Sequence, residues 1–103
     1  MARVQSLVAD LMLASRVSEP LRAAGHEVVS GDAPSADVDA IVADLDVTDP
    51  GPLAAAGPPT LGFYAHTDVD TRKAALDAGV DIVVPRSRMV RELPELVERL
   101  LAG

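Results

Sequence analysis

The stretch D-A-I-V-A-D-L, residues 39–45, decides the fold of this chain. Its middle is an unbroken apolar run, and an acid closes it. Such a run is typical of a strand that is buried on both faces of a parallel sheet. Strand-like and helix-like segments alternate on either side of it, as expected when helices cover a parallel sheet. We therefore expect residues 40–44 to form a central strand of an α/β domain.

Toward the N-terminus, two further strands and one helix are expected. Residues 4–9 read as a strand that ends at Asp10, and residues 27–30 (EVVS) read as another. Between them, apolar side chains recur at helical spacing, and Gly25 is a typical C-terminal stop. Pro20 lies inside this helix and removes a backbone donor, so we expect a kink or a late start there.

Toward the C-terminus, residues 60–65 (TLGFYA) and 82–84 are expected to be strands, the second ending at Pro85. Thr67 and Asp70 form a capping box for a helix over residues 68–78. A terminal helix follows, with Ser87 as the expected N-cap of the segment and Pro94 in the first turn. Its apolar stripe comprises Leu93, Leu96, Val97, Leu100 and Leu101.

Two connections are rich in proline and glycine. Residues 31–38 are too few for a normal crossover helix, although in extended form they can still join two parallel strands. Residues 46–59 have room for about two helical turns around residues 52–56. We therefore expect one face of the sheet to be thinly covered.

The composition limits the number of domains and the kinds of site and partner that the protein can have. A chain of 103 residues supports a single domain, here 1–103, and it has no cysteine for a disulfide or a thiolate metal site. Its formal net charge of −7 and two aromatic residues argue against nucleic-acid binding. We see no signal peptide and no stretch long enough to span a membrane, so we expect a cytoplasmic protein without a membrane partner.

The order of these elements resembles the receiver domain of response regulators in two-component signalling. D-A-I-V-A-D-L resembles the stretch that carries the phosphate-accepting aspartate of that family, which places Asp44 at the acceptor position. Residues 76–85 (LDAGVDIVVP) resemble the family's run into its last strand. The resemblance implies a three-layer, flavodoxin-like (CheY-like) fold with a parallel five-stranded sheet in the order 2-1-3-4-5. The family's second helix is lost and its third is shortened.

The departures from the family pattern concern its chemistry. The acid pair that binds magnesium aligns with Val8 and Ala9, and Asp10 lies just beyond it. The switch hydroxyl aligns with Tyr64. The conserved lysine of the family aligns with Pro85, and Arg86 is next to it.

Ligands of open parallel sheets bind at the carboxyl ends of the strands. With the order 2-1-3-4-5, this edge gathers Asp10, Asp44, Asp46, Tyr64, His66 and Arg86. Asp10, Asp44 and Asp46 are the candidate ligands of Mg²⁺, which prefers oxygen donors. Tyr64 and Arg86 are the candidate switch and anion contacts. The opposing interpretation is that Asp44 and Asp46 only end a strand and turn the chain.

Three functions remain open, and none of them is enzymatic turnover. The leading hypothesis is a stand-alone pseudo-receiver, a protein-interaction module without standard phosphotransfer. Its expected interface comprises the helix 68–78, the fifth strand and the terminal helix, with Arg72, Lys73, Arg88 and Arg91, and could form a weak homodimer. The second is a degenerate but active phosphoreceiver with Asp44 as acceptor and Mg²⁺ as cofactor. The third is a small-ligand or nucleotide binder at the carboxyl edge.

Overall fold

The computed structural model describes residues 2–65 and 69–103. Its five strands form one sheet in the order β2-β1-β3-β4-β5, and every neighbouring pair is parallel. The strands are β1 (Arg3–Leu7), β2 (Glu27–Ser30), β3 (Ala40–Asp44), β4 (Thr60–Tyr64) and β5 (Ile82–Pro85). The predicted fold class and strand order are therefore confirmed.

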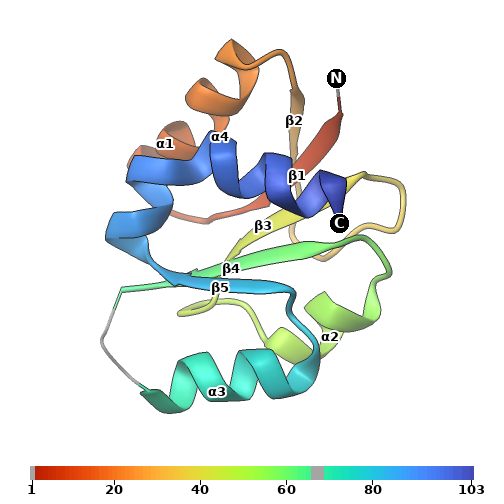
Figure 1. Cartoon of the computed structure of the whole chain (residues 1–103), viewed down its shortest axis with the longest axis vertical. Helices are drawn as coiled ribbons and strands as arrows, with labels where there is room; N and C mark the ends of the chain where they lie inside the picture. The colour runs from red at the N-terminus through yellow and green to blue at the C-terminus, as the bar shows by residue number, and fades with distance from the viewer. Residues whose placement is uncertain (1, 66–68) are drawn as a thin grey trace.

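Helices cover both faces of the sheet. The helices are α1 (Leu11–Ala23), α2 (Pro50–Ala55), α3 (Val69–Ala78) and α4 (Arg86–Ala102). Figure 1 shows α1 and α4 on one side of the sheet and α2 and α3 on the other. Within residues 2–65 and 69–103, no helix has both the length and the apolar character needed to cross a membrane.

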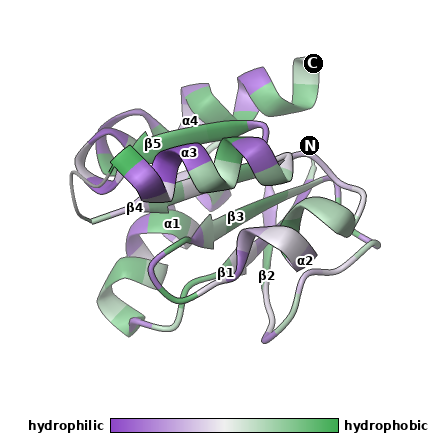
Figure 2. Ribbon diagram, turned by 90° about the horizontal axis from the view of Figure 1, so that it is seen from below, coloured by the Kyte–Doolittle hydropathy of each residue, from purple (hydrophilic) through white to green (hydrophobic). Residues whose placement is uncertain are grey.

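The central strand β3 is removed from water along its whole length. All five of its residues are buried, and it pairs with β1 on one side and β4 on the other. Val42 joins the apolar cluster under α1 and α4, whereas Ile41 and Ala43 join the cluster under α2 and α3. Figure 2 shows β3 in hydrophobic green behind helices of mixed colour. This burial explains why the strand is apolar up to its final acid.

A loop replaces the helix that normally joins β2 to β3. In this loop the side chain of Gln5, which is buried, donates from Nε2 to the carbonyl of Ala33 at 2.9 Å. Its Oε1 accepts from the backbone N–H of Ser35, also at 2.9 Å. One side chain from β1 thus satisfies two backbone groups of a loop that has no helix of its own. The helix that comes second in receiver domains is therefore lost between β2 and β3, as predicted. The helix that comes third in receiver domains corresponds to α2 here, and it is shortened to six residues, also as predicted.

The terminal helix differs from the prediction at its start. It begins at Arg86 with Pro85 as the N-cap, which has no side chain able to bond the first N–H groups, so the predicted cap at Ser87 is wrong. A break at Glu92 (φ −122°, ψ 15°) divides the helix just before Pro94. Pro94 therefore lies in the first turn of the second part, where its missing donor costs little.

Three other local predictions have different outcomes. Helix α1 runs through Pro20 without a break in its described backbone, so this proline removes one hydrogen bond and does not end the helix. The capping box at Thr67 lies outside the described residues. Asp10, expected just beyond the first strand, is the N-cap of α1.

The hydrogen bonds of Gln5 predict a clear stability effect. Gln5→Ala should lower the free energy of unfolding by about 2–3 kcal/mol, because it removes two partly buried hydrogen bonds and leaves their partners unsatisfied. Gln5→Met retains the volume and should lose less. Urea unfolding followed by circular dichroism measures both variants. A Gln5→Ala protein within about 0.5 kcal/mol of the wild type would contradict this role.

Candidate functional site

Asp44 ends β3 at the carboxyl edge of the sheet, where its side chain is buried. It is 6% exposed, and its Oδ1 accepts a hydrogen bond from the backbone N–H of Asp46 at 2.9 Å. This bond closes the turn that follows the strand, an ordinary use of an aspartate. The acceptor position implied by the family resemblance is thus occupied by a carboxyl that also turns the chain.

Burial raises the pKa of Asp44 above its ordinary value. The backbone N–H of Asp46 acts in the opposite direction, because it stabilises the carboxylate. The negative charges of Asp46 and Asp10 raise the pKa further, whereas the positive charge of Arg86 lowers it. Asp10, Asp46 and Arg86 therefore share the electrostatic environment of Asp44, as the strand order predicts.

The two neighbouring acids are both bound to backbone N–H groups. Oδ1 of Asp10 accepts from Met12 at 2.9 Å and from Leu13 at 3.1 Å, which caps the N-terminus of α1. Oδ2 of Asp46 accepts from Ala65 at 2.9 Å, and this bond ties the end of β4 to the turn after β3. Each carboxylate holds a local element of the fold.

These donors do not fit the magnesium site that the family resemblance implies. Among the described residues, no three His, Cys, Asp or Glu side chains are grouped so that they could hold a metal ion. Asp10 turns to its own helix and Asp46 to β4, so the three acids expected to converge around a cation do not form a cluster of ligands. A site built from Asp10, Asp44 and Asp46 therefore stays a prediction, which the contacts of the described residues do not support.

The candidate switch and anion contacts face opposite sides of the sheet, although Tyr64 pairs with Pro85, the residue just before Arg86. Tyr64 is 8% exposed and packs in the apolar cluster under α2 and α3. Arg86 is exposed at the first position of α4, and no ion pair within the described chain joins it to Asp44. Instead, Arg86 lines a depression of about 260 Å³ beside Asp10 and Arg16. His66, also placed at this edge by the sequence, lies outside the described residues.

The basic residues of the expected interface fall into two groups. Arg72 and Lys73 are exposed on α3. Arg88 and Arg91 both contact Oε2 of Glu92, at 3.3 and 3.2 Å. Glu92 therefore offsets part of the positive charge of Arg88 and Arg91, and α3 contributes the more available cations of the expected interface.

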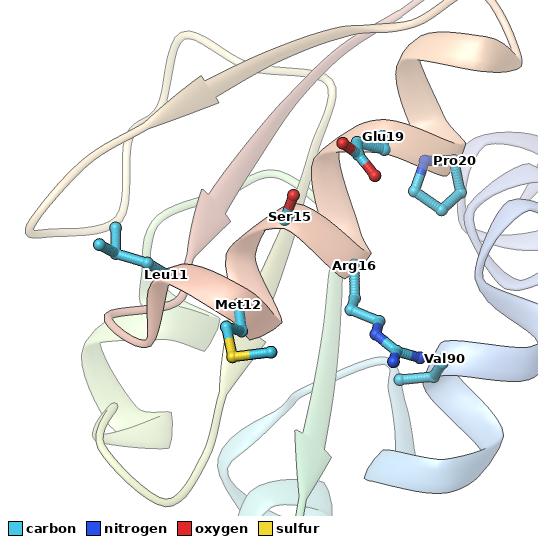
Figure 3. Close-up of a pocket in the computed structure, with 7 residues that line it drawn as sticks. All are labelled: Leu11, Met12, Ser15, Arg16, Glu19, Pro20 and Val90. Carbon is cyan, nitrogen blue, oxygen red and sulfur yellow. The ribbon is translucent and has the colours of Figure 1, made fainter.

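A groove between α1 and α4 was not predicted from the sequence. Its volume is about 590 Å³, and Leu11 and Met12 at its end are 85% and 80% exposed. Arg16 extends across it toward Val90 of α4 (Figure 3). The apolar positions of α1 indicated its buried face only, and large apolar side chains on its exposed first turn are the signal that could have revealed this surface. The groove is lined by Leu11, Met12, Ser15, Arg16, Glu19, Pro20 and Val90.

The burial of Asp44 predicts how stability depends on pH. A carboxyl whose pKa is higher in the folded than in the unfolded state binds more protons when folded, so stability falls as pH rises from the ordinary value of 3.8 through the raised one. Asp44→Asn stays neutral and retains an acceptor for the N–H of Asp46. It should therefore be more stable than the wild type at pH 7.

This advantage should shrink as the pH falls toward 3.8, where the wild-type carboxyl is protonated. Urea unfolding at pH 7 and pH 4 measures the difference, and Asp77→Asn on the exposed surface of α3 is the control. A less stable Asp44→Asn protein at pH 7, or a pH-independent difference, would show that the buried charge is not destabilising.

Comparisons with known proteins give similarity of structure only. No protein-family model and no curated protein sequence matches the chain. The signal receiver domain of NarL from Mycobacterium tuberculosis superposes with a TM-score of 0.82 at 18% identity, over 99% of this chain and 97% of that one. The receiver domain of the Francisella response regulator 1452 gives 0.81 at 16% identity, over 99% and 98%.

NtrX from Brucella abortus gives a TM-score of 0.82 at 16% identity; the alignment covers 98% of this chain but 26% of NtrX. The chain thus spans about a quarter of that protein and nearly all of the isolated receiver domains. At these sequence identities the similarity establishes the fold only. The chemistry has to be inferred from the residues of this chain. The chain has the fold of response-regulator receiver domains.

Proposed function

We propose that this chain is a cytoplasmic pseudo-receiver, a protein-interaction module that signals without standard phosphotransfer. One observation carries the proposal. In a receiver fold, the acids next to Asp44 are bound to the backbone of α1 and β4 and do not form a cluster of metal ligands. Phosphoryl transfer depends on cations that neutralise the developing charge, and here the carboxylates that would hold one are used for capping.

The other positions of the family's chemistry support the same conclusion. Tyr64 has its side chain in an apolar cluster, so the position of the switch hydroxyl is used for packing. Pro85 stands where the family has a lysine, and it pairs with Tyr64 in the sheet. Arg86 follows it, but a guanidinium is larger and more rigid than an ammonium group and does not simply replace it.

Two exposed surfaces could receive a protein partner. The first is the face made by α3, β5 and α4, where β5 is an edge strand and Arg72 and Lys73 are exposed. Charged groups at such a face favour specific, salt-sensitive contacts, including a weak homodimer. The second is the groove beside Leu11 and Met12. We assign the main contact to the first surface, because its charges can select a partner.

Phosphate acceptance at Asp44 is the competing function, and a phosphodonor tests it. The protein is incubated with Mg²⁺ and acetyl phosphate and its intact mass is measured, with an active receiver domain in the same reaction as the positive control. We expect no gain of a phosphoryl group, because the acids of the described residues do not form a cluster of metal ligands around Asp44. A phosphoryl gain that disappears in Asp44→Asn would overturn the pseudo-receiver proposal.

Charge reversal tests the interface. Arg72→Glu combined with Lys73→Glu should weaken partner capture and self-association about three- to tenfold, since each exposed contact contributes a fraction of a kcal/mol. Affinity capture from a lysate of the source organism and sedimentation velocity measure the two effects. The control variant is Arg22→Glu, an exposed charge in the last turn of α1 that lies outside this face.

Met12→Glu separates the second surface from the first. If it abolishes capture while the double variant on α3 does not, the partner binds the groove between α1 and α4 and the assignment to the α3 face is wrong. Loss of capture in the α3 variant alone supports the assignment.

A further inference from the structure

A second hollow, of about 590 Å³, lies at the carboxyl ends of β1 and β2, beside the start of α1. Its wall combines hydroxyl and apolar groups. Ser6, Ser30 and Thr48 supply the hydroxyls, and Leu11 and Val47 stand among the apolar residues. These two apolar side chains are 85% and 66% exposed. Neither the capping acids nor the exposed cations of α3 line this hollow.

Ser6 gives the hollow its most specific feature. The residue is 5% exposed, and its Oγ is the one buried side-chain polar atom of the described chain that has no hydrogen-bond partner. A buried hydroxyl without a partner lowers stability, so proteins normally satisfy such groups. Ser6 lines the hollow, but its Oγ is itself closed off from solvent. A rotation of this side chain about its Cα–Cβ bond would turn the hydroxyl into the hollow, where a bound molecule would supply the missing partner.

The sheet brings a second hydroxyl to the same place. Ser6 is paired with Ser30 in the parallel register of β1 and β2, so both side chains point to the face covered by α1. The loop that replaces the missing helix continues from Ser30 into Gly31 and Asp32, which also line the hollow. Gln5 anchors this loop from the opposite face of the sheet, through Ala33 and Ser35.

The charges at the hollow restrict the class of ligand. Asp32 supplies a carboxylate, and no arginine, lysine or histidine lines the wall. The N–H groups of Met12 and Leu13 at the start of α1 are already bound by Asp10, so the helix terminus does not attract an anion here. A nucleotide or another phosphate would be repelled by the carboxylate of Asp32 and would find no cluster of hydrogen-bond donors. An uncharged or positively charged molecule would not be repelled.

We propose that this hollow, defined by Ser6, Ser30, Asp32 and the apolar rim of Leu11 and Val47, binds a small amphipathic molecule. The ligand is uncharged or positively charged and carries a hydroxyl or amino group that bonds to Ser6. Its apolar part lies against the rim, because burial of apolar surface provides most of the affinity in such sites. The site is independent of the proposed protein interface.

Three probes with the same apolar body and different polar groups test the proposal. ¹⁵N-labelled protein is titrated with cyclohexylmethanol, with protonated cyclohexylmethylamine and with cyclohexanecarboxylate, and amide shifts are followed by NMR. The alcohol and the amine should give saturable shifts at residues 6–9, 30–32 and 47–48, and the carboxylate should bind more weakly than either. No saturable shift with any probe, shifts confined to another surface, or tightest binding by the carboxylate would overturn the proposal.

Ser6→Ala tests the hydroxyl itself. It should weaken binding of the alcohol about fivefold, the effect of one hydrogen bond, without lowering the melting temperature. Ser15→Ala, the same substitution on the groove side of α1, should change neither quantity. Unchanged affinity in Ser6→Ala, or a large fall in its melting temperature, would show that the hydroxyl serves the fold and not a ligand. Ser6→Val, which fills part of the hollow, should abolish binding while the protein remains folded.

Discussion

The removal of β3 from water on both faces is the constraint on which the rest of the structure depends. The strand pairs with β1 and β4, and its residues supply both apolar clusters of the core. Since the strand ends in Asp44, a carboxyl is held at the border of the core with a raised pKa. In the turn that follows, the side chain of Asp44 accepts from the backbone N–H of Asp46, and the side chain of Asp46 accepts from the backbone N–H of Ala65 after β4.

This use of the acids connects the fold to its function. A carboxylate that caps a helix or closes a turn stabilises the fold through that hydrogen bond. If the carboxylate turned toward a cation, the hydrogen bond would be lost. Asp10 caps α1 and Asp46 holds the end of β4, so the carboxyl edge is stabilised by its own backbone. The chain retains the shape of a receiver, while its acids serve the architecture of that edge. The proposed interaction role follows from this combination.

Much of the fold could be predicted from the sequence, because strand residues such as 27–30 and 40–44 are short β-branched runs between turn signals. The strand order came from the resemblance to receiver domains. Contacts between distant residues could not be predicted. His26 accepts from the N–H of Ala2 and bonds to Glu98, 72 residues away, which no local pattern indicates. The start of α4 at Arg86 was missed because its first residues carry charge and little apolar periodicity.

The sequence places the candidate residues along one edge of the sheet, but it does not indicate which groups their side chains bind. Strand order alone was enough to bring Asp10, Asp44, Asp46 and Arg86 to one edge, whereas the hydrogen bonds of each carboxylate depend on where α1 begins and how β4 ends. Whether these acids bind the backbone or a metal ion can be measured by titrating ¹⁵N-labelled protein with Mg²⁺ and following the amides of Met12, Leu13 and Ala65 that the acids bind. If the acids serve the backbone, no saturable shift appears up to tens of millimolar Mg²⁺. Saturable binding that displaces these amides would show that the acids are metal ligands and would contradict this expectation.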